Sequence, residues 1–357
     1  MGNERGIAFI ALTILVVIVI APGVSAQRRH QNAIIDLWAE GKTAFGVYVP
    51  SAGQPLPSDP RPTAEQQTQQ QQQQIQQQIT QLQQQLQQVQ AGGGGRGERG
   101  RGGVGGGGRG QGPGGRGPAP APQYTKAIGE ALGKNPLYDF VFLNLEGAFS
   151  LDAVKNIADG LRAPGAVSRK TLIVRIPTIG DAGPELTKFR VKASFDAGAD
   201  SVAIPHVEGV EQARQAISFF AAATNDIWTP DNPAGEKLGM IMIEDPQTLT
   251  QVKEIADLKG YSMLACGVGS IGGAFNSGGI AAGLVALGLL QPDVPRTLGE
   301  LATAKVLAET KRTKLANMIT ASQQNLEQRV KDGFQALLFS GAGSDETIRA
   351  GRALAKR

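Results

Sequence analysis

The chain has 357 residues, enough for one α/β barrel of about 250 residues with appendages. A single cysteine, Cys266, excludes an internal disulfide framework and a multi-cysteine metal site. The net charge of +4 equals the surplus of five arginines over one glutamate within residues 91–123, so the remainder is formally neutral and predicts no basic face for nucleic acid.

The amino terminus has the features of a secretory signal. Arg5 precedes an apolar run over residues 7–21, and Val24-Ser25-Ala26 then supplies a small-x-small cleavage sequence. The run is shorter than the roughly 20 residues that span a bilayer comfortably. We therefore expect residues 1–26 to be removed and the mature protein to be periplasmic or extracellular, with no stable membrane span. An uncleaved, membrane-anchored signal is the alternative.

Residues 27–54 are expected to start the barrel, with a helix over 33–38 and a strand over 44–49. A low-complexity insertion follows over 55–123, first Gln-rich and then Gly/Arg/Pro-rich from residue 91. Apolar residues of the Gln tract have an a/d spacing: Ile75, Ile79, Leu82, Leu86 and Val89. This covers little more than two heptads, so a self-associating helix and a weakly helical spacer both stay open. The Gly-rich part has too little apolar surface to fold.

Regular structure is expected again over residues 124–357, where helical patterns alternate with short apolar strands. The expected strands cover 139–145, 171–176, 201–205, 238–243, 262–266 and 336–339, with a weakly marked one near 313–320. The expected helices cover 125–132, 183–197, 209–222 and 246–258, with others starting at 150 and 298. Together with the strand at 44–49 this predicts eight parallel strand–helix units, that is, a (β/α)8 TIM barrel of the α/β class.

Several of these strands end on polar residues of catalytic type. Asn144 and Glu146 follow one strand, Arg175 ends the next, and His206 and Glu244 follow two later ones. The carboxyl ends of parallel barrel strands open onto the face that holds the active site. The sequence therefore predicts that these side chains converge in an enzyme pocket.

At these strand ends the chain resembles the HpcH/HpaI aldolase and citrate lyase family. Four ordered segments carry the resemblance: Tyr138–Glu146 (YDFVFLNLE), Val174–Pro177 (VRIP), Asp196–Pro205 (DAGADSVAIP) and Met242–Glu244 (MIE). The likeness covers residues 33–49 and 124 to the end. It implies a barrel of the phosphoenolpyruvate/pyruvate type, which cleaves or forms a carbon–carbon bond next to a 2-oxo acid such as pyruvate through a metal-bound enolate.

The resemblance also implies roles for particular residues. Glu244 matches a ligand of a divalent metal, Mg or Mn, and Arg175 matches the residue that stabilises the enolate charge. The family usually reads Asp-x-Glu-His where this chain has Asn144-Leu145-Glu146-Gly147, so a catalytic His and an Asp are replaced. Ser270 stands where the family has a second metal-ligand Asp, and a hydroxyl is a poor substitute for a carboxylate.

Each site residue also has a structural interpretation. Arg175 could form an ion pair with Glu146 or Glu244, although a buried charge at a strand end favours function. His206 could be structural or a replacement general base. Asp245 could add a carboxylate, but adjacent strand residues point to opposite sides.

Two further segments are candidates for binding substrate. Ser270 is one, and the loop Ser340–Ser344 is the other, because backbone N–H groups there could hold a carboxylate or a phosphate. A Gly-rich turn without a ligand is the alternative for that loop. Cys266 is interpreted as a small core residue.

Three functions follow. The first is a metal-assisted carbon–carbon lyase of the aldolase type, acting on a 2-oxo acid and expected to be a homo-oligomer. The second is a secreted, non-catalytic module that binds a small carboxylate on the same barrel. The third is another reaction that uses His206 as its base.

Overall fold

The computed structural model describes residues 30–69, 72–73, 76, 80, 123–277 and 294–357. The predicted export signal and most of the predicted insertion lie outside these residues. Among the described residues, no helix combines the length and apolar character needed to cross a membrane.

Eight parallel strands close into one barrel in sequence order, which confirms the predicted fold class. The strands are β1 (Ala44–Tyr48), β2 (Phe140–Asn144), β3 (Thr171–Arg175), β4 (Ser201–Ile204), β5 (Leu238–Ile243), β6 (Met263–Cys266), β7 (Ala316–Thr320) and β8 (Ala336–Phe339). All of them lie within the expected ranges, including the weakly marked β7.

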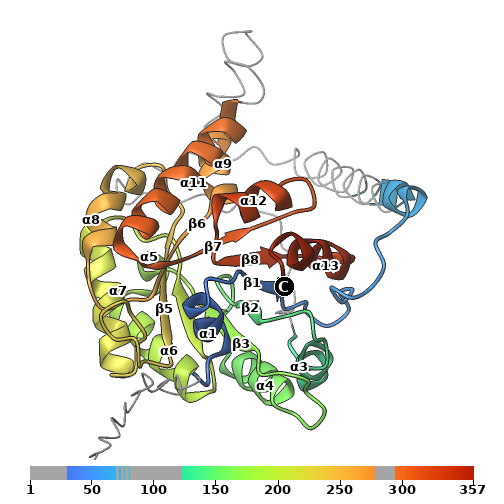
Figure 1. Ribbon diagram of the computed structural model, residues 1–357, viewed down its shortest axis with the longest axis horizontal. Coiled ribbons are helices and arrows are strands. Elements are labelled where there is room, and N and C mark those ends of the chain that lie inside the picture. Colours follow the sequence, from blue (N-terminus) through green and yellow to red (C-terminus); the bar gives the residue numbers. More distant parts are fainter. Residues whose placement is uncertain (1–29, 70–71, 74–75, 77–79, 81–122, 278–293) are drawn as a thin grey trace, which may run out of the picture.

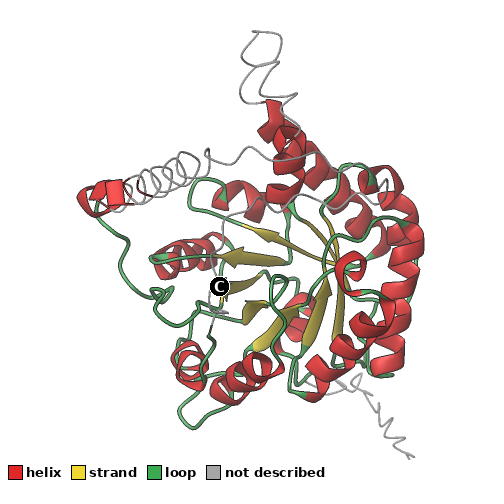
Figure 2. Cartoon of the chain, turned by 180° about the vertical axis from the view of Figure 1, so that it is seen from behind, coloured by secondary structure: helices red, strands yellow, loops and turns green. Residues whose placement is uncertain are grey.

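The helices surround this barrel (Figures 1 and 2). Their bounds are α1 (Ala33–Ala39), α3 (Lys126–Gly133), α4 (Leu151–Leu161), α5 (Ile179–Ala182), α6 (Pro184–Asp196), α7 (Val210–Ala223), α8 (Val252–Asp257), α9 (Val268–Ser277), α11 (Val294–Thr313), α12 (Leu326–Asp332) and α13 (Ser344–Leu354). The helix expected over 246–258 is instead a 3-10 turn, Thr248–Gln251, followed by α8. The helices α5, α9, α12 and α13 had not been expected.

The barrel interior is filled mainly by unbranched and small side chains. Met240, Met242, Met263 and Met318, the four methionines after Met1, all belong to this inner core. Flexible thioether side chains suit the irregular space inside a closed barrel. The buried face of α1, including Ile34 and Trp38, joins the same core, so α1 closes one end of the barrel (Figure 1).

The first part of the predicted insertion packs on the barrel. The amide of Gly343 donates to the carbonyl of Asp59 at 2.7 Å, and the amide of Asp345 donates to the carbonyl of Pro57 at 3.5 Å. The Arg61 guanidinium donates to the Gly343 carbonyl at 3.2 Å and to the Thr347 hydroxyl. Backbone carbonyls of this segment therefore cap the first turn of α13.

Candidate active site

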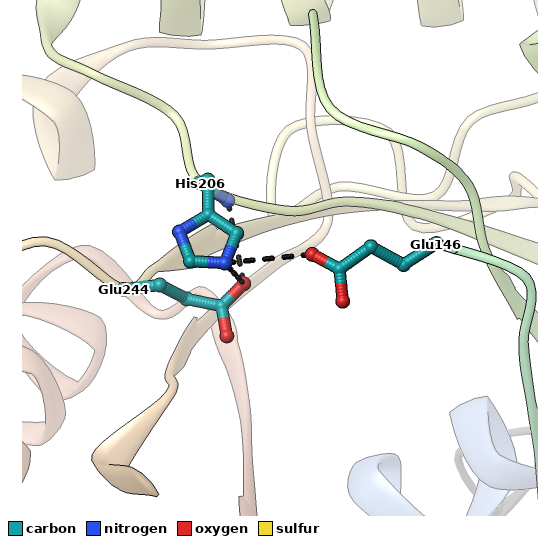
Figure 3. Close-up of side chains that lie close together, drawn as sticks. All are labelled: Glu146, His206 and Glu244. Atoms are coloured by element: carbon teal, nitrogen blue, oxygen red, sulfur yellow. Dashed lines mark hydrogen bonds and ion pairs between the residues drawn. The ribbon is translucent and has the colours of Figure 1, made fainter. Parts of the chain in front are cut away.

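Side chains from four consecutive strands meet at the carboxyl end of the barrel. Glu146 follows β2, Arg175 ends β3, His206 follows β4 and Glu244 follows β5. Figure 3 shows the imidazole of His206 between the two glutamates. The structure thus brings together the four ionisable residues that the sequence analysis selected at these strand ends.

Arg175 joins the two carboxylates with a single nitrogen. Its Nη2 donates to Glu146 Oε1 and to Glu244 Oε2, each at 2.7 Å. The residue is 8% exposed, and its bond to Glu244 is buried, where charge interactions are strong, whereas its bond to Glu146 is only part-buried. Its Nε is buried and has no hydrogen-bond partner among the described residues. The guanidinium therefore keeps a donor that no described residue satisfies, and at a strand end such a donor is a candidate contact for substrate.

Glu244 is the most deeply buried carboxylate of the cluster, at 2% exposure. Besides Arg175, its carboxylate accepts hydrogen bonds from the Ser270 hydroxyl at 3.0 Å and the His206 amide at 3.3 Å. The backbone at Gly267 passes so close that an added Cβ would lie 2.4 Å from Glu244 Oε1. Glu244 is therefore held in one position by partners from three strand ends.

His206 sits in a left-handed backbone conformation, with φ of 48°. This region is uncommon for residues other than glycine and costs free energy, and such strain is often found at functional sites. His206 Nε2 lies 3.4 Å from Glu146 Oε1 and 3.6 Å from Glu244 Oε2. Its Nδ1 lies 3.5 Å from Asp245 Oδ2, so Asp245 reaches the site through the imidazole.

The donor atoms of Glu146, His206 and Glu244 lie within 4.8 Å of one another. Two carboxylates face one guanidinium, which leaves one negative charge in excess when the imidazole is neutral. Carboxylate oxygens are preferred ligands of Mg and Mn, and imidazole nitrogen suits several divalent metals. The residues present therefore fit a divalent cation.

The remaining predicted site residues differ in their relation to the cluster. Asn144 contacts it indirectly, because its Oδ1 accepts a hydrogen bond from the Glu146 amide at 3.2 Å. Ser270 contacts Glu244 directly. Ser340 instead lines a separate cavity of about 250 Å³ with Arg61 and Thr347. Backbone amides of the adjacent loop donate hydrogen bonds to the carbonyls of Pro57 and Asp59.

Cys266 takes no part in the cluster's hydrogen bonds. It is 7% exposed, and burial raises the pKa of its thiol to about 11, although a hydrogen bond from Thr303 lowers it. A thiol that stays protonated at neutral pH is a poor nucleophile and metal ligand. This agrees with its interpretation as a core residue.

One residue near the site was missed in the sequence. Tyr48 ends β1, and burial raises the pKa of its hydroxyl, while a hydrogen bond with Thr320 and the charge of Arg175 act in the opposite direction. Its ring packs edge-on against Phe142 with centroids 5.1 Å apart. The rule that selected Arg175, a polar residue at the carboxyl end of a strand, would also have selected Tyr48.

Comparison with known proteins shows what the segment that carries this site is similar to. Residues 132–271 match the HpcH/HpaI aldolase/citrate lyase family, and this range contains every residue of the cluster. No curated protein sequence matches the chain.

Several solved structures are similar to the chain. An HpcH/HpaI aldolase/citrate lyase family protein from Burkholderia cenocepacia is 22% identical, covers 65% of this chain and 90% of its own, and has a TM-score of 0.45. An HpcH/HpaI aldolase from Desulfitobacterium hafniense is 13% identical, covers 90% and 95%, and has a TM-score of 0.49. The citrate lyase beta subunit of M. tuberculosis, complexed with oxaloacetate and magnesium, is 15% identical, covers 62% and 88%, and has a TM-score of 0.40.

The resemblance read from the four sequence segments is thus confirmed in the part of the chain that carries the cluster. Residues 132–271 match the model of the HpcH/HpaI aldolase/citrate lyase family.

Proposed function

We propose that this protein is a metal-assisted carbon–carbon lyase of the aldolase type, acting on a 2-oxo acid through a pyruvate-like enolate. One observation carries the proposal: the Arg175 guanidinium lies 2.7 Å from two carboxylates, with His206 beside them, at the active-site end of the barrel. Members of the family are metal-dependent lyases. The reaction and the substrate class are our own inference.

Glu146 and Glu244 would hold the cation. A bound divalent cation would supply Lewis-acid polarisation of the substrate ketone. Ser270 and the His206 amide orient the Glu244 carboxylate for this task, since both donate to it. The carboxylate of Glu146 is more exposed, at 27% of its side chain, so it is the ligand that can move as substrate enters.

Arg175 would stabilise negative charge on the enolate oxygen. Its Nε has no partner in the described part of the chain, and its Nη2 is shared between two acceptors, so the guanidinium can turn from one carboxylate to a substrate oxygen. A donor that is already in place where charge develops stabilises the transition state more than the ground state.

His206 would act as the general base. Asp245 faces Nδ1 and favours a proton on that nitrogen, which leaves the lone pair on Nε2, the nitrogen that faces Glu146 and Glu244. In the enolate-forming direction His206 Nε2 takes a proton from the carbon next to the ketone. A Nε2 that accepts this proton cannot also hold the cation, so the proposal assigns the cation to the carboxylates.

A module that binds a small carboxylate without turnover is the second candidate. It is favoured by Gly147 and Ser270, which stand at the places of the family's catalytic His and second metal-ligand Asp. It would use Arg175 for binding and leave His206 without a catalytic role.

The two functions are separated by exchange of pyruvate methyl protons with deuterated water, followed by mass spectrometry. The lyase predicts exchange that needs manganese and is lost in His206→Asn. Binding of pyruvate without exchange would favour the module. Exchange by His206→Asn at the wild-type rate would contradict the assignment of the base.

A further inference from the structure

A second cavity opens at the opposite end of the barrel from the charged cluster. Its lining comes from α1 and from loops that precede β5, β7 and β8, which places it at the amino ends of the strands. Its volume is about 550 Å³, within the range of small-molecule sites. Catalytic residues of such barrels lie at the carboxyl end. This cavity is therefore separate from the proposed lyase site and does not depend on it.

Two aromatic side chains form a wall of the cavity. Trp38 on α1 and Trp228 before β5 are in contact, with ring centroids 5.6 Å apart and planes tilted by 54°. Trp38 is buried and fixed by a hydrogen bond from its Nε1 to the Gln335 carbonyl at 3.0 Å. Trp228 is only partly buried, so part of its surface is open to a ligand. Indole rings that are held in place favour flat aromatic partners.

The cavity rim carries one cationic side chain. Lys314 is one of the described residues that line it, and none of these is Asp or Glu. Among the residues that the structure describes, Lys314 has no hydrogen-bond or ion-pair partner, although other exposed lysines such as Lys192 and Lys253 pair with carboxylates. His30 also lines the cavity, and the nearby Glu236 lies 3.4 Å from its Nδ1.

The position of Lys314 is also strained. Its φ is 62°, in the left-handed region, which is costly for a lysine. Asn would tolerate this conformation better, so local backbone geometry does not explain why a long cationic side chain stands here. The ammonium group at the rim of an apolar, aromatic cavity matches the carboxylate of a ligand whose ring packs on Trp228.

We propose that this cavity binds a planar aromatic carboxylate, with the ring against Trp38 and Trp228 and the carboxylate on Lys314. Nothing in the proposal requires turnover at Arg175 or a bound cation. The site is a second, non-catalytic ligand site on the barrel.

The test uses the protein's own fluorescence, because Trp38 and Trp228 are its two tryptophans. The probe is 4-iodobenzoate, whose heavy atom quenches indole emission, and the neutral comparison ligand is 4-iodobenzyl alcohol. We expect saturable quenching by 4-iodobenzoate and weaker, charge-independent quenching by the alcohol.

Lys314→Asn removes the charge but suits the left-handed backbone. Lys356→Asn is the matched control, because Lys356 is also an exposed lysine with positive φ, at 55°, and does not line the cavity. Lys314→Asn should weaken 4-iodobenzoate binding about fivefold, which is what the loss of one favourable, partly exposed ion pair allows. Lys356→Asn should leave it unchanged.

Two results would overturn the proposal. One is quenching by 4-iodobenzoate that rises linearly without saturation, as it does for collisions in solution. The other is an equal affinity of the wild type, Lys314→Asn and Lys356→Asn. The pyruvate exchange rate of Lys314→Asn should equal that of the wild type, so failure at this cavity is distinguishable from failure of the proposed lyase.

Discussion

The two ends of the barrel differ in what their strands carry. At the carboxyl end, β2 to β5 lead into Glu146, Arg175, His206 and Glu244, which bond to one another and fit a cation. At the amino end, α1 fills the opening with apolar side chains, and Trp38 contacts Trp228. The closed sheet is common to both, so the difference comes from the residues that follow or precede each strand. The comparison shows that the carboxyl end gathers ionisable side chains, whereas the amino end is filled by apolar packing.

The largest expected effect is at the carboxyl end. Arg175→Lys keeps the charge but loses the planar guanidinium, whose Nη2 bonds to both carboxylates and whose Nε is proposed to bind a substrate oxygen. It should slow manganese-dependent pyruvate exchange by about two orders of magnitude, as the loss of one preorganised donor does elsewhere. Arg349→Lys, at an exposed position on α13, should keep the wild-type rate. If Arg175→Lys exchanged pyruvate protons as fast as Arg349→Lys, Arg175 would have no role in the reaction.

The position of Glu244 can be tested through the backbone beside it. An alanine at 267 places a Cβ 2.4 Å from Glu244 Oε1, whereas one at 269 meets nothing within 4 Å. Gly267→Ala should weaken manganese binding about tenfold by moving the carboxylate, since misplaced ligands lose affinity on this scale. Gly269→Ala should bind manganese like the wild type in a calorimetric titration. Unchanged binding by Gly267→Ala would show that Glu244 is not a ligand.

Lys170 is buried next to β3 at the amino end of the barrel, and it should make the free energy of unfolding depend on pH. Burial lowers the pKa of its ammonium from 10.5 to about 8, although the charge of Asp139 raises it. Between these values the unfolded chain binds more protons than the folded one, so this residue makes stability rise with pH from about 8 to 10.5. Below pH 8 the folded protein must bury the charge.

Lys170→Met should therefore raise the free energy of unfolding by about 2 kcal/mol at pH 7 and remove the rise between pH 8 and 10.5. Urea unfolding at several pH values measures this. Lys192→Met, at an exposed position on α6, serves as the control and should keep the wild-type pH profile. A Lys170→Met variant that is less stable at pH 7 would contradict the account.

The smallest effect concerns the insertion. Deletion of residues 70–122 with a short Gly/Ser linker should leave the melting temperature unchanged. Deletion of 55–122 also removes the contacts of Pro57, Asp59 and Arg61 with the start of α13, and it should cost about 1 kcal/mol, the usual value of a lost helix cap. Equal melting temperatures for the two deletions would show that the cap is dispensable. A large loss with the shorter deletion would show that 70–122 packs on the barrel.

The strands were predictable because, in seven of them, any polar residue stands at an end of the strand and the interior is apolar. The eighth, β7, was weakly marked because its second residue is Asn317, which is 3% exposed and bonded to Thr310 and Gln335. Short helices such as α12 carry too few apolar residues to give a clear period.

The site was predictable to the level of which strand ends converge. The sequence could not predict that one nitrogen of Arg175 bonds to both glutamates. Those bonds depend on the side-chain torsions of Glu146 and Glu244, which are separated from Arg175 by 29 and 69 positions in the chain. The sequence grouped Ser340 with the substrate site, but the Pro57–Arg61 segment lies on that loop instead. The contact of the Pro57–Arg61 segment with the barrel could not be predicted, because a segment without regular secondary structure has no hydrophobic periodicity in its sequence.

The central claim is that the carboxyl-end cluster is a joint site for a divalent cation and a 2-oxo acid. The most direct test is calorimetric titration of pyruvate into the wild type and Glu244→Gln, each with and without saturating manganese. We predict that manganese strengthens pyruvate binding to the wild type at least tenfold, about 1.4 kcal/mol, and has no effect on Glu244→Gln. Pyruvate affinity that is the same with and without manganese in the wild type would contradict the claim.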